Sequence, residues 1–299
     1  MDQLLNFPAV ADGLRKVENR IRRLSGSSTL PGINQGAEHV ITAGGKRLRP
    51  ALTLATALAL GKTPDRRVIT AAACVELIHA GSLVHDDLME DAKTRRGTTT
   101  LNADLGTGKA LVIGDFMLAR AGLAAITSVS RPVAEVLAAT MVELAEGQYL
   151  ETVDLFNRHR TQENALRSIT GKTASLFRAG CLVAAICAHA SPEERARMAT
   201  YGERFGLIFQ ILDDLMDLTG DVREGVYTLP LLRALEKDPG LLDGDVAANL
   251  ARSTIVPDTL AYCRELAAES LCTDPLLANL PSTYINKVEK ALSTCVDAR

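Results

Sequence analysis

Two acidic segments stand out because their carboxylates recur at helical spacing within apolar surroundings. They are residues 86–91, Asp-Asp-Leu-Met-Glu-Asp, and residues 213–217, Asp-Asp-Leu-Met-Asp. On an α-helix, residues three and four apart are neighbours on one face. Each segment therefore predicts three carboxylates on one helix face. We call Asp86, Asp87 and Glu90 the first carboxylate set, and Asp213, Asp214 and Asp217 the second.

Like charges at these spacings destabilise a helix by roughly 0.2–0.5 kcal/mol per exposed pair, so a cation should compensate them. Magnesium prefers one or two protein carboxylates together with water and substrate phosphates. Two such sets would hold several Mg2+ ions around a diphosphate. The alternative is an ordinary solvated helix face. Leu83 and Val84 before the first set, and Ile211 and Leu212 before the second, favour the wall of a cleft instead.

Basic residues near the first set suit a phosphate ligand. Residues 44–50, Gly-Gly-Lys-Arg-Leu-Arg-Pro, place three cations at a predicted helix start, where backbone N–H groups also favour anions. Arg95 and Arg96 follow the first set as its helix ends, and His79 lies two turns before Asp86 on the same face. A surface basic turn, an ordinary helix end and a satisfied core histidine remain the alternatives.

Two further positions give weaker signals of the same kind. Lys172 and Thr173 follow Gly171, and Gln210 lies one turn before Asp213. Each is ordinary helix surface unless the predicted cleft includes it.

The elements that must position these residues are helices. Apolar residues recur at three and four along nearly every long segment, and convincing period-two strands are absent. We expect helices over residues 50–60, 65–91, 107–127, 132–154, 162–189 and 192–219, with shorter ones in the last third. Ser191 and Pro192 supply a cap and a first-turn proline. Because one site must use both carboxylate sets and no linker is apparent, we predict a single large α-helical domain over residues 1–299.

Composition excludes some classes of protein. The chain has 299 residues, 33 basic and 36 acidic, so its net charge of −3 favours neither nucleic acid nor an anionic membrane. Six cysteines without a C-x-x-C pair indicate reduced core thiols in a cytoplasmic protein. We find no signal peptide, and no uncharged stretch reaches the ~18 apolar residues of a membrane span.

Together, these residues resemble the trans-isoprenyl diphosphate synthases of the polyprenyl synthetase family. The similarity runs almost end to end and includes Gly-Gly-Lys-Arg-Leu-Arg-Pro at 44–50, Glu-Leu-Ile-His at 76–79, His-Asp-Asp at 85–87, Arg-Arg-Gly at 95–97, Gly-Asp-Phe at 114–116, Gly-Gln at 147–148, Gly-Lys-Thr at 171–173, Phe-Gln at 209–210, Asp-Asp at 213–214 and Thr-Leu-Pro at 228–230. The resemblance implies an all-α isoprenoid synthase fold with helices around a central cleft.

The resemblance also implies roles for the candidate residues. Both carboxylate sets would bind Mg2+, about three ions per site with substrate present. Arg95 and Lys172 would hold the allylic diphosphate. Isopentenyl diphosphate would be held by Lys46, Arg49, His79 and Arg96. Gln210 and the backbone of Lys172 and Thr173 would orient dipoles toward an allylic cation. The family implies a homodimer through helices that include residues 114–120.

Product length should depend on the helix wall before the first set. Successive turns back from Asp86 carry Ser82, Ile78, Val75 and Ala71, with Gly81 beside Ser82. Short-chain members of the family carry bulky aromatics at the positions of Gly81 and Ser82. Both are small here, so the resemblance implies a product longer than farnesyl, geranylgeranyl or beyond.

The chain departs from the family pattern at two places. The third position of the first set is usually Asp, but here it is Glu90, and Asp91 beside it is the alternative ligand. After the second set, the family carries a loop with a Gly-Lys pair, whereas this chain continues directly through residues 217–225. Either the lid is shortened, or residues are missing from the sequence at this point.

Two other functions compete with the synthase hypothesis. A catalytically weak regulatory subunit of a heteromeric synthase would explain the absent lid lysine, although both carboxylate sets and the basic segment are retained. A terpene cyclase also uses an acidic set of the first kind but needs no isopentenyl diphosphate site. Lys46, Arg49 and Arg96 argue against a cyclase.

Overall fold

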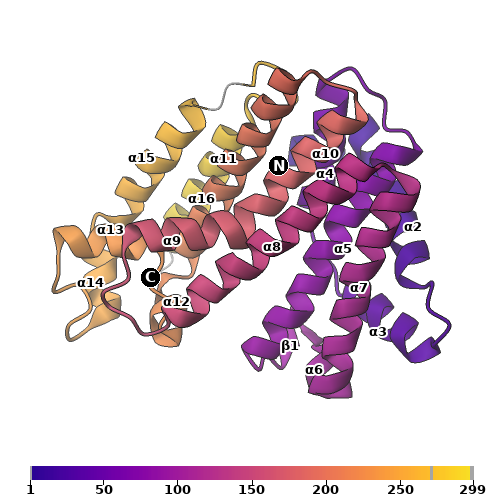
Figure 1. Cartoon of the computed structure of the whole chain (residues 1–299). Helices are drawn as coiled ribbons and strands as arrows, with labels where there is room; N and C mark the ends of the chain where they lie inside the picture. The colour runs from indigo at the N-terminus through magenta and orange to yellow at the C-terminus, as the bar shows by residue number, and fades with distance from the viewer. Residues whose placement is uncertain (1, 270–271, 297–299) are drawn as a thin grey trace. The chain divides into compact units, whose positions relative to one another are not determined.

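The computed structural model describes residues 2–269 and 272–296, and helices dominate it, as predicted (Figure 1). The chain divides into two compact units. We call residues 2–141 and 179–196 the N-terminal unit, and the described parts of 142–178 and 197–299 the C-terminal unit. Each unit is described by itself, and the single domain expected over 1–299 stays a prediction.

The N-terminal unit holds the following elements: α1 Asp2–Asn6, α2 Pro8–Ser25, α3 Pro31–Thr42, α4 Leu48–Ala59, α5 Arg66–Met89, β1 Thr94–Arg95, β2 Thr98–Thr99, α6 Leu101–Leu105 and α7 Thr107–Ser128. Three helices contain a point at which the chain passes from one unit to the other: α8 Arg131–Val153, α10 Ser175–Cys187 and α11 Pro192–Met216. The C-terminal unit holds α9 Gln162–Ile169, the π-helix η1 Thr170–Ala174, α12 Leu218–Glu224, α13 Leu229–Lys237, α14 Val246–Arg252, α15 Ile255–Ala268 and α16 Leu280–Val296.

Helix α5 is the centre of the N-terminal unit and packs against α7, α2 and α4. Its middle is buried on every side, including the small residues Ala72 and Ala73, because a helix that is apolar all round needs neighbours on all faces. Asp65 caps its start, since Asp65 Oδ1 accepts from the backbone N–H of Arg67 at 2.9 Å and of Val68 at 3.0 Å. The helix thus presents its last turn at a fixed place.

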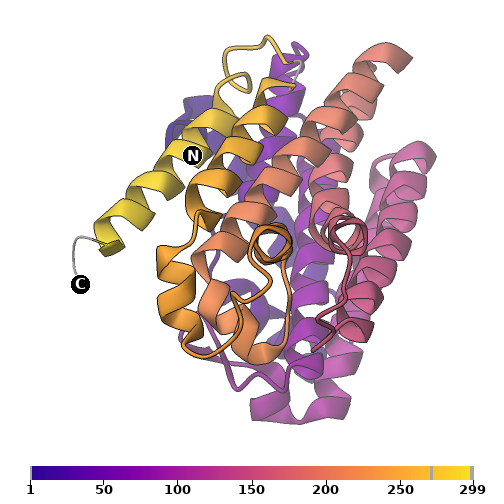
Figure 2. The ribbon, with the colours of Figure 1, turned by 90° about the vertical axis from the view of Figure 1, so that its left-hand side faces the viewer.

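An aromatic cluster forms part of the core of the C-terminal unit. The Phe177 ring lies 5.5 Å from that of Phe205 and 5.4 Å from that of Phe209, measured between centroids. Phe209 also stacks on Tyr284 of α16 at 5.4 Å. Helices α15 and α16 pack against each other in the same unit (Figure 2). These ring contacts hold α11 in place just before the second carboxylate set.

Several predicted boundaries differ from the structure, each for a local reason. Helix α4 begins at Leu48, two residues before Pro50, because Arg47 adopts a left-handed conformation with φ 50° just before it. The helix expected over 162–189 is interrupted by the π-helix. The helix that was expected to reach residue 219 ends at Met216. Ser191 caps α11 as predicted, with Glu194 N–H donating to Ser191 Oγ at 3.2 Å.

The described cysteine side chains are buried free thiols, as predicted: Cys74, Cys181, Cys187, Cys263 and Cys272. Burial raises the pKa of the Cys74 thiol to about 12 and that of Cys187 to about 11, so both remain protonated. The side chain of Cys295 lies outside the described part of the chain.

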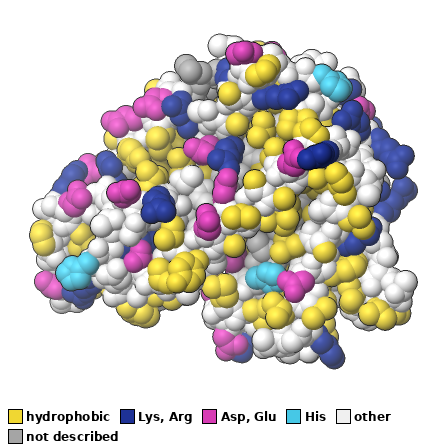
Figure 3. Space-filling model, viewed as in Figure 1, with side chains coloured by type: hydrophobic (Ala, Val, Ile, Leu, Met, Phe, Trp, Pro, Cys, Tyr) yellow, Lys and Arg dark blue, Asp and Glu magenta, His cyan; other side chains and the backbone are white. Residues whose placement is uncertain are grey.

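Three helical segments are long and apolar enough to cross a membrane, judged by length and composition alone. They are Arg66–Met89, Thr107–Ser128 and Gln162–Cys187, with 78%, 39% and 72% of the apolar window buried inside the protein. The segment Thr107–Ser128 is α7, and apolar side chains gather on the part of the face that α7 occupies (Figure 3). The expectation that the chain has no membrane span stays a prediction.

Candidate active site

The first carboxylate set lies at the end of α5, where one arginine binds two of its members. Asp87 is only 7% exposed. Arg95 donates from Nε to Asp87 Oδ1 at 2.5 Å and from Nη2 to Glu90 Oε2 at 3.4 Å. Asp91 instead has φ 49° and accepts from Lys93 at 2.6 Å. The protein therefore supplies separate cations to these acids, Arg95 to Asp87 and Glu90, and Lys93 to Asp91.

A short hairpin, which sequence reasoning treated as a loop, positions Arg95. Strands β1 and β2 pair antiparallel, with Arg95 opposite Thr98. The turn between them is Arg96 and Gly97, both left-handed at φ 53° and 75°, as a two-residue hairpin of the primed type requires. The chain thereby reverses after α5 and returns the Arg95 side chain to the carboxylates.

His79 lies among arginines in the same unit. Arg49 Nη1 is 3.3 Å from His79 Nε2. Burial, followed by the positive charges of Arg49, Arg96, Arg47 and Arg95, holds the pKa of His79 well below its usual value. The imidazole is therefore neutral at physiological pH. Of the residues expected to hold isopentenyl diphosphate, Arg49 and Arg96 thus lie near His79, and Arg95, expected at the allylic diphosphate, lies near it as well.

Arg47, one of three cations in the basic segment, has a structural role. Its guanidinium donates to Glu18, to Glu76 Oε1 at 3.0 Å and to the Ile41 carbonyl at 2.7 Å. With the Gly44 carbonyl at 3.4 Å, four acceptors within the protein occupy the guanidinium, so it is unsuited to a ligand. Lys46 beside it is exposed.

Gly45 lets Arg96 reach the basic segment. Gly45 has φ 137°, and a Cβ there would lie 2.6 Å from Arg96 Nη1. Arg96 donates to the carbonyl of Gly44. A side chain at position 45 would therefore be strained and would displace the guanidinium.

In the second carboxylate set, the hydrogen-bond donor to Asp214 is a neutral amide. Asp214 is 7% exposed, and its Oδ1 accepts from Gln210 Nε2 at 2.6 Å, while its Oδ2 has no hydrogen-bond partner. Burial, together with the negative charges of Asp213 and Glu151, raises the pKa of Asp214 to about 7, against the lowering effects of Gln210 and Lys172. This carboxylate is held in a site that disfavours its charge.

Asp217 does not share the helix of its set. Helix α11 ends at Met216, and Asp217 is exposed with φ −118° directly before α12. Helical spacing placed it on the face of Asp213 and Asp214, but the helix stops one residue short. Asp217 is therefore carried by the junction of α11 and α12.

Sequence reasoning missed two acids in the C-terminal unit. Glu151 pairs with Lys172 Nζ. Burial and the negative charges of Asp214, Asp217, Glu224 and Glu151 together raise the pKa of Asp221 to about 8. A signal was present, because Asp221 follows Asp217 by four residues and Glu151 follows the Gly-Gln step by three.

The π-helix carries the predicted residues Lys172 and Thr173. It lies so close to α8 that a Cβ on Gly147 would be 2.2 Å from the Lys172 backbone nitrogen. Single π turns inside α-helices often occur at functional sites. Thr173 Oγ1 donates to Gln210 Oε1 at 2.8 Å, which completes a chain from the π-helix through Gln210 to Asp214. Gln210 thus positions a carboxylate of the second set.

The donor chemistry of the second set fits a hard cation. In residues 2–269 and 272–296, no three His, Cys, Asp or Glu side chains gather closely enough to form a metal cage by themselves. The partnerless Asp214 Oδ2 and the mutual repulsion of Asp214 and Asp221 are relieved by a positive charge. Oxygen ligands without a complete cage suit Mg2+ that arrives with substrate phosphates.

The proposed chain-length residues lie along α5. Val75 and Ile78 are fully buried, and Ser82 is half-buried with its hydroxyl donating to the His79 carbonyl at 2.9 Å. A Cβ on Gly81 would lie 3.0 Å from the Leu118 side chain of α7. The small size of residue 81 is therefore needed for α7 to approach, whereas Ser82 carries no such constraint.

Comparison with known proteins places these features in a family. The polyprenyl synthetase family model matches residues 31–243. Octaprenyl diphosphate synthase of Escherichia coli is 36% identical over 214 residues, which are 68% of this chain and 66% of that protein, just under two thirds of its length. Heptaprenyl diphosphate synthase component 2 of Geobacillus stearothermophilus is 35% identical over 78% of this chain and 75% of that protein.

A solved structure from the same family is similar to this chain in its fold. The polyprenyl synthase of Caulobacter crescentus, complexed with calcium and isoprenyl diphosphate, is 28% identical with a TM-score of 0.82 over 95% of this chain and 97% of that chain. The chain belongs to the polyprenyl synthetase family, and the family and all-α fold expected from the sequence are confirmed.

Proposed function

We propose that this chain is a Mg2+-dependent prenyltransferase that condenses isopentenyl diphosphate with an allylic diphosphate. The observation that carries the proposal is Arg95, which binds Asp87 directly and also belongs to the arginines around neutral His79. One end of the N-terminal unit thus combines carboxylates for a cation with cations for a diphosphate. The relatives named as prenyl diphosphate synthases, and the calcium and isoprenyl diphosphate of the Caulobacter protein, support it.

We assign the candidate residues to the metal ions and to the two substrates. Both carboxylate sets would hold Mg2+, which when bound neutralises charge on the leaving diphosphate. Arg95 and Lys172 would bind the allylic diphosphate. Lys46, Arg49, His79 and Arg96 would bind isopentenyl diphosphate. The neutral ring of His79 carries one N–H group, and that group can donate a hydrogen bond to a phosphate oxygen.

The reaction needs no protein nucleophile. The carbon–oxygen bond of the allylic diphosphate breaks with both electrons leaving on oxygen, and the cationic side chains stabilise that charge. The double bond of isopentenyl diphosphate then forms the new carbon–carbon bond, and the proton is lost to the released diphosphate. Gln210, held by Thr173, keeps Asp214 in place during this sequence.

We further propose an all-trans product of geranylgeranyl length or longer, since Ser82 leaves the α5 wall without an aromatic floor. The test supplies the purified protein with Mg2+, farnesyl diphosphate and isopentenyl diphosphate and analyses products by mass spectrometry. Elongation past farnesyl is expected, and Ser82→Phe should shorten the product. A protein that elongates nothing alone but activates a partner synthase would favour the regulatory subunit, a possibility kept by the likeness to a synthase component.

We also propose that the enzyme is a homodimer through α7. Val112, Leu123 and Ile126 are exposed although apolar, and their spacing places them on one face of that helix. Light scattering after size exclusion should give twice the chain mass of 31.9 kDa. Leu123→Lys with Ile126→Lys should give a monomer, and a dimer that survives both changes would contradict this interface.

A further inference from the structure

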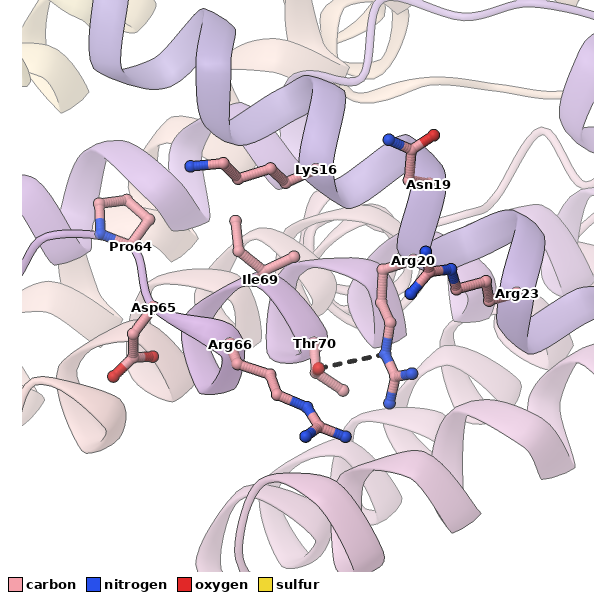
Figure 4. A pocket seen from close by; sticks show the side chains of 9 residues that line it. All are labelled: Lys16, Asn19, Arg20, Arg23, Pro64, Asp65, Arg66, Ile69 and Thr70. Atoms are coloured by element: carbon pink, nitrogen blue, oxygen red, sulfur yellow. Dashed lines mark hydrogen bonds between the residues drawn. The ribbon is translucent and has the colours of Figure 1, made fainter.

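A second cationic pocket lies in the N-terminal unit, between α2 and the start of α5 (Figure 4). Its volume is about 680 Å³. Its cations are Lys16, Arg20, Arg23 and Arg66. Ile69 and Thr70 also line it, and both are buried, so the pocket is a hollow rather than a flat surface.

The pocket is remote from the first carboxylate set. Arg66 begins α5, and Asp86 lies in its last turn, 20 residues further on. At 1.5 Å per residue, this separation is roughly 30 Å. A ligand of diphosphate size cannot span that distance, so the proposed reaction does not account for these arginines.

The charges that line the pocket are poorly balanced. Asp65 is the only acid among its lining residues. Asp65 already caps α5 through the N–H groups of Arg67 and Val68, and it pairs with Lys62 at 2.9 Å. Its charge is therefore committed to groups other than the pocket arginines.

The three pocket arginines have no acidic partner within the described residues. Arg20 donates to two neutral hydroxyl groups, Thr70 Oγ1 at 3.2 Å and Ser128 Oγ at 3.3 Å (Figure 4 draws the first). Arg23 and Arg66 take part in none of the ion pairs formed by residues 2–269 and 272–296. Three guanidinium groups beside one hollow repel one another unless an anion joins them.

Other arginines of α2 behave differently. Arg15 pairs with Asp12 at 3.0 Å, and Arg22 approaches Glu38 at 3.9 Å. Both point outside the pocket lining. The same helix therefore provides arginines with acidic partners as a matched comparison for those without.

We propose that this pocket binds a phosphate-bearing anion through Arg20, Arg23 and Arg66. A guanidinium presents two parallel N–H groups to phosphate oxygens, and Arg20 retains donors beyond those given to Thr70 and Ser128. The volume admits a diphosphate with room for a further group. A soluble phosphate ester and a phospholipid headgroup offer the same chemistry.

The test compares Arg23→Gln/Arg66→Gln with Arg15→Gln/Arg22→Gln, which removes the same charge from α2 outside the pocket. Inorganic pyrophosphate is titrated calorimetrically into each full-length protein in EDTA. Wild type and the Arg15/Arg22 variant should bind one more equivalent per chain than the Arg23/Arg66 variant, or bind at least about tenfold more tightly there. The basic cluster around His79 is unchanged in both variants and serves as an internal reference.

A second arm separates the two sources of phosphate. Sedimentation with phosphatidylglycerol vesicles, compared with phosphatidylcholine vesicles, should show a loss confined to the Arg23/Arg66 variant if a headgroup is bound. A loss with pyrophosphate alone identifies a soluble phosphate compound. Equal behaviour of the two double variants with both probes would overturn the proposal. Circular dichroism and unchanged prenyl transfer show that each variant is folded.

Discussion

The two carboxylate sets end similar apolar helices but are balanced in different ways. In the first set, Arg95 binds Asp87 and Glu90 within the protein. In the second, Asp214 has one partnerless oxygen, and the nearby lysine, Lys172, is paired with Glu151. Arg95 thus balances two carboxylates of the first set directly, whereas Asp214 of the second set keeps a buried oxygen without a hydrogen-bond partner.

The largest expected effect comes from removing charge at the second set. Asp214→Asn should lower kcat by about 100-fold or more, because a metal-binding charge is lost. Its thermal stability without Mg2+ should not fall, since the wild-type carboxylate is buried with an unsatisfied oxygen. Steady-state assays and thermal melts with and without Mg2+ measure both. Asp243→Asn, an exposed acid of the same unit, serves as the control.

In the first set, by contrast, removing the partner of a buried carboxylate should lower the free energy of unfolding. Arg95→Gln leaves the nearly buried Asp87 without its ion-pair partner and should destabilise the protein by about 1 kcal/mol, a figure reduced because Arg95 is one-third exposed. Urea unfolding gives the free energy. Lys93→Gln, which breaks only the exposed pair with Asp91, should change it by less than about 0.5 kcal/mol. Equal losses in both variants would show that the two regions do not differ in this way.

A third test addresses the support of the second set. Gly147→Ala places a Cβ 2.2 Å from the Lys172 nitrogen and should destabilise the protein by about 1–3 kcal/mol while reducing activity. Gly122→Ala has nothing within 4 Å and should stabilise α7 by up to about 1 kcal/mol. Chemical unfolding of both variants measures these changes in the free energy of unfolding. A neutral Gly147→Ala would mean that the π-helix does not depend on this close approach.

The smallest expected effect is the pH dependence from His79. The folded protein disfavours protonated His79, whereas the unfolded chain accepts a proton near pH 6.5, so the unfolded state binds more protons as the pH falls. The free energy of unfolding should therefore be fully retained above about pH 6.5 and decrease below it. In His79→Gln this decrease between pH 7 and 5 should be smaller. An identical pH profile in both proteins would show that the pKa of His79 is not lowered in the folded state.

Much of this difference between the sets was not visible in the sequence. The spacing of Asp86, Asp87 and Glu90 predicted the first set, and Arg95 was expected nearby. That Arg95 binds these carboxylates depends on the Arg96–Gly97 turn, whose left-handed conformation reverses the chain after α5. Asp217 was misplaced because periodicity does not reveal where a helix stops.

The sequence by itself determined the helices and the residue types at the candidate site, because periodicity and spacing are local properties of the chain, and its motifs carried the resemblance to the family. Tertiary structure decided which charges meet. Arg47 forms an ion pair with Glu18, and Lys172 forms one with Glu151. The two members of each pair are distant in sequence, so spacing could not reveal them. The two carboxylate sets look alike as strings of letters. They differ in the folded protein because compensation of charge depends on which side chains approach within a few ångströms.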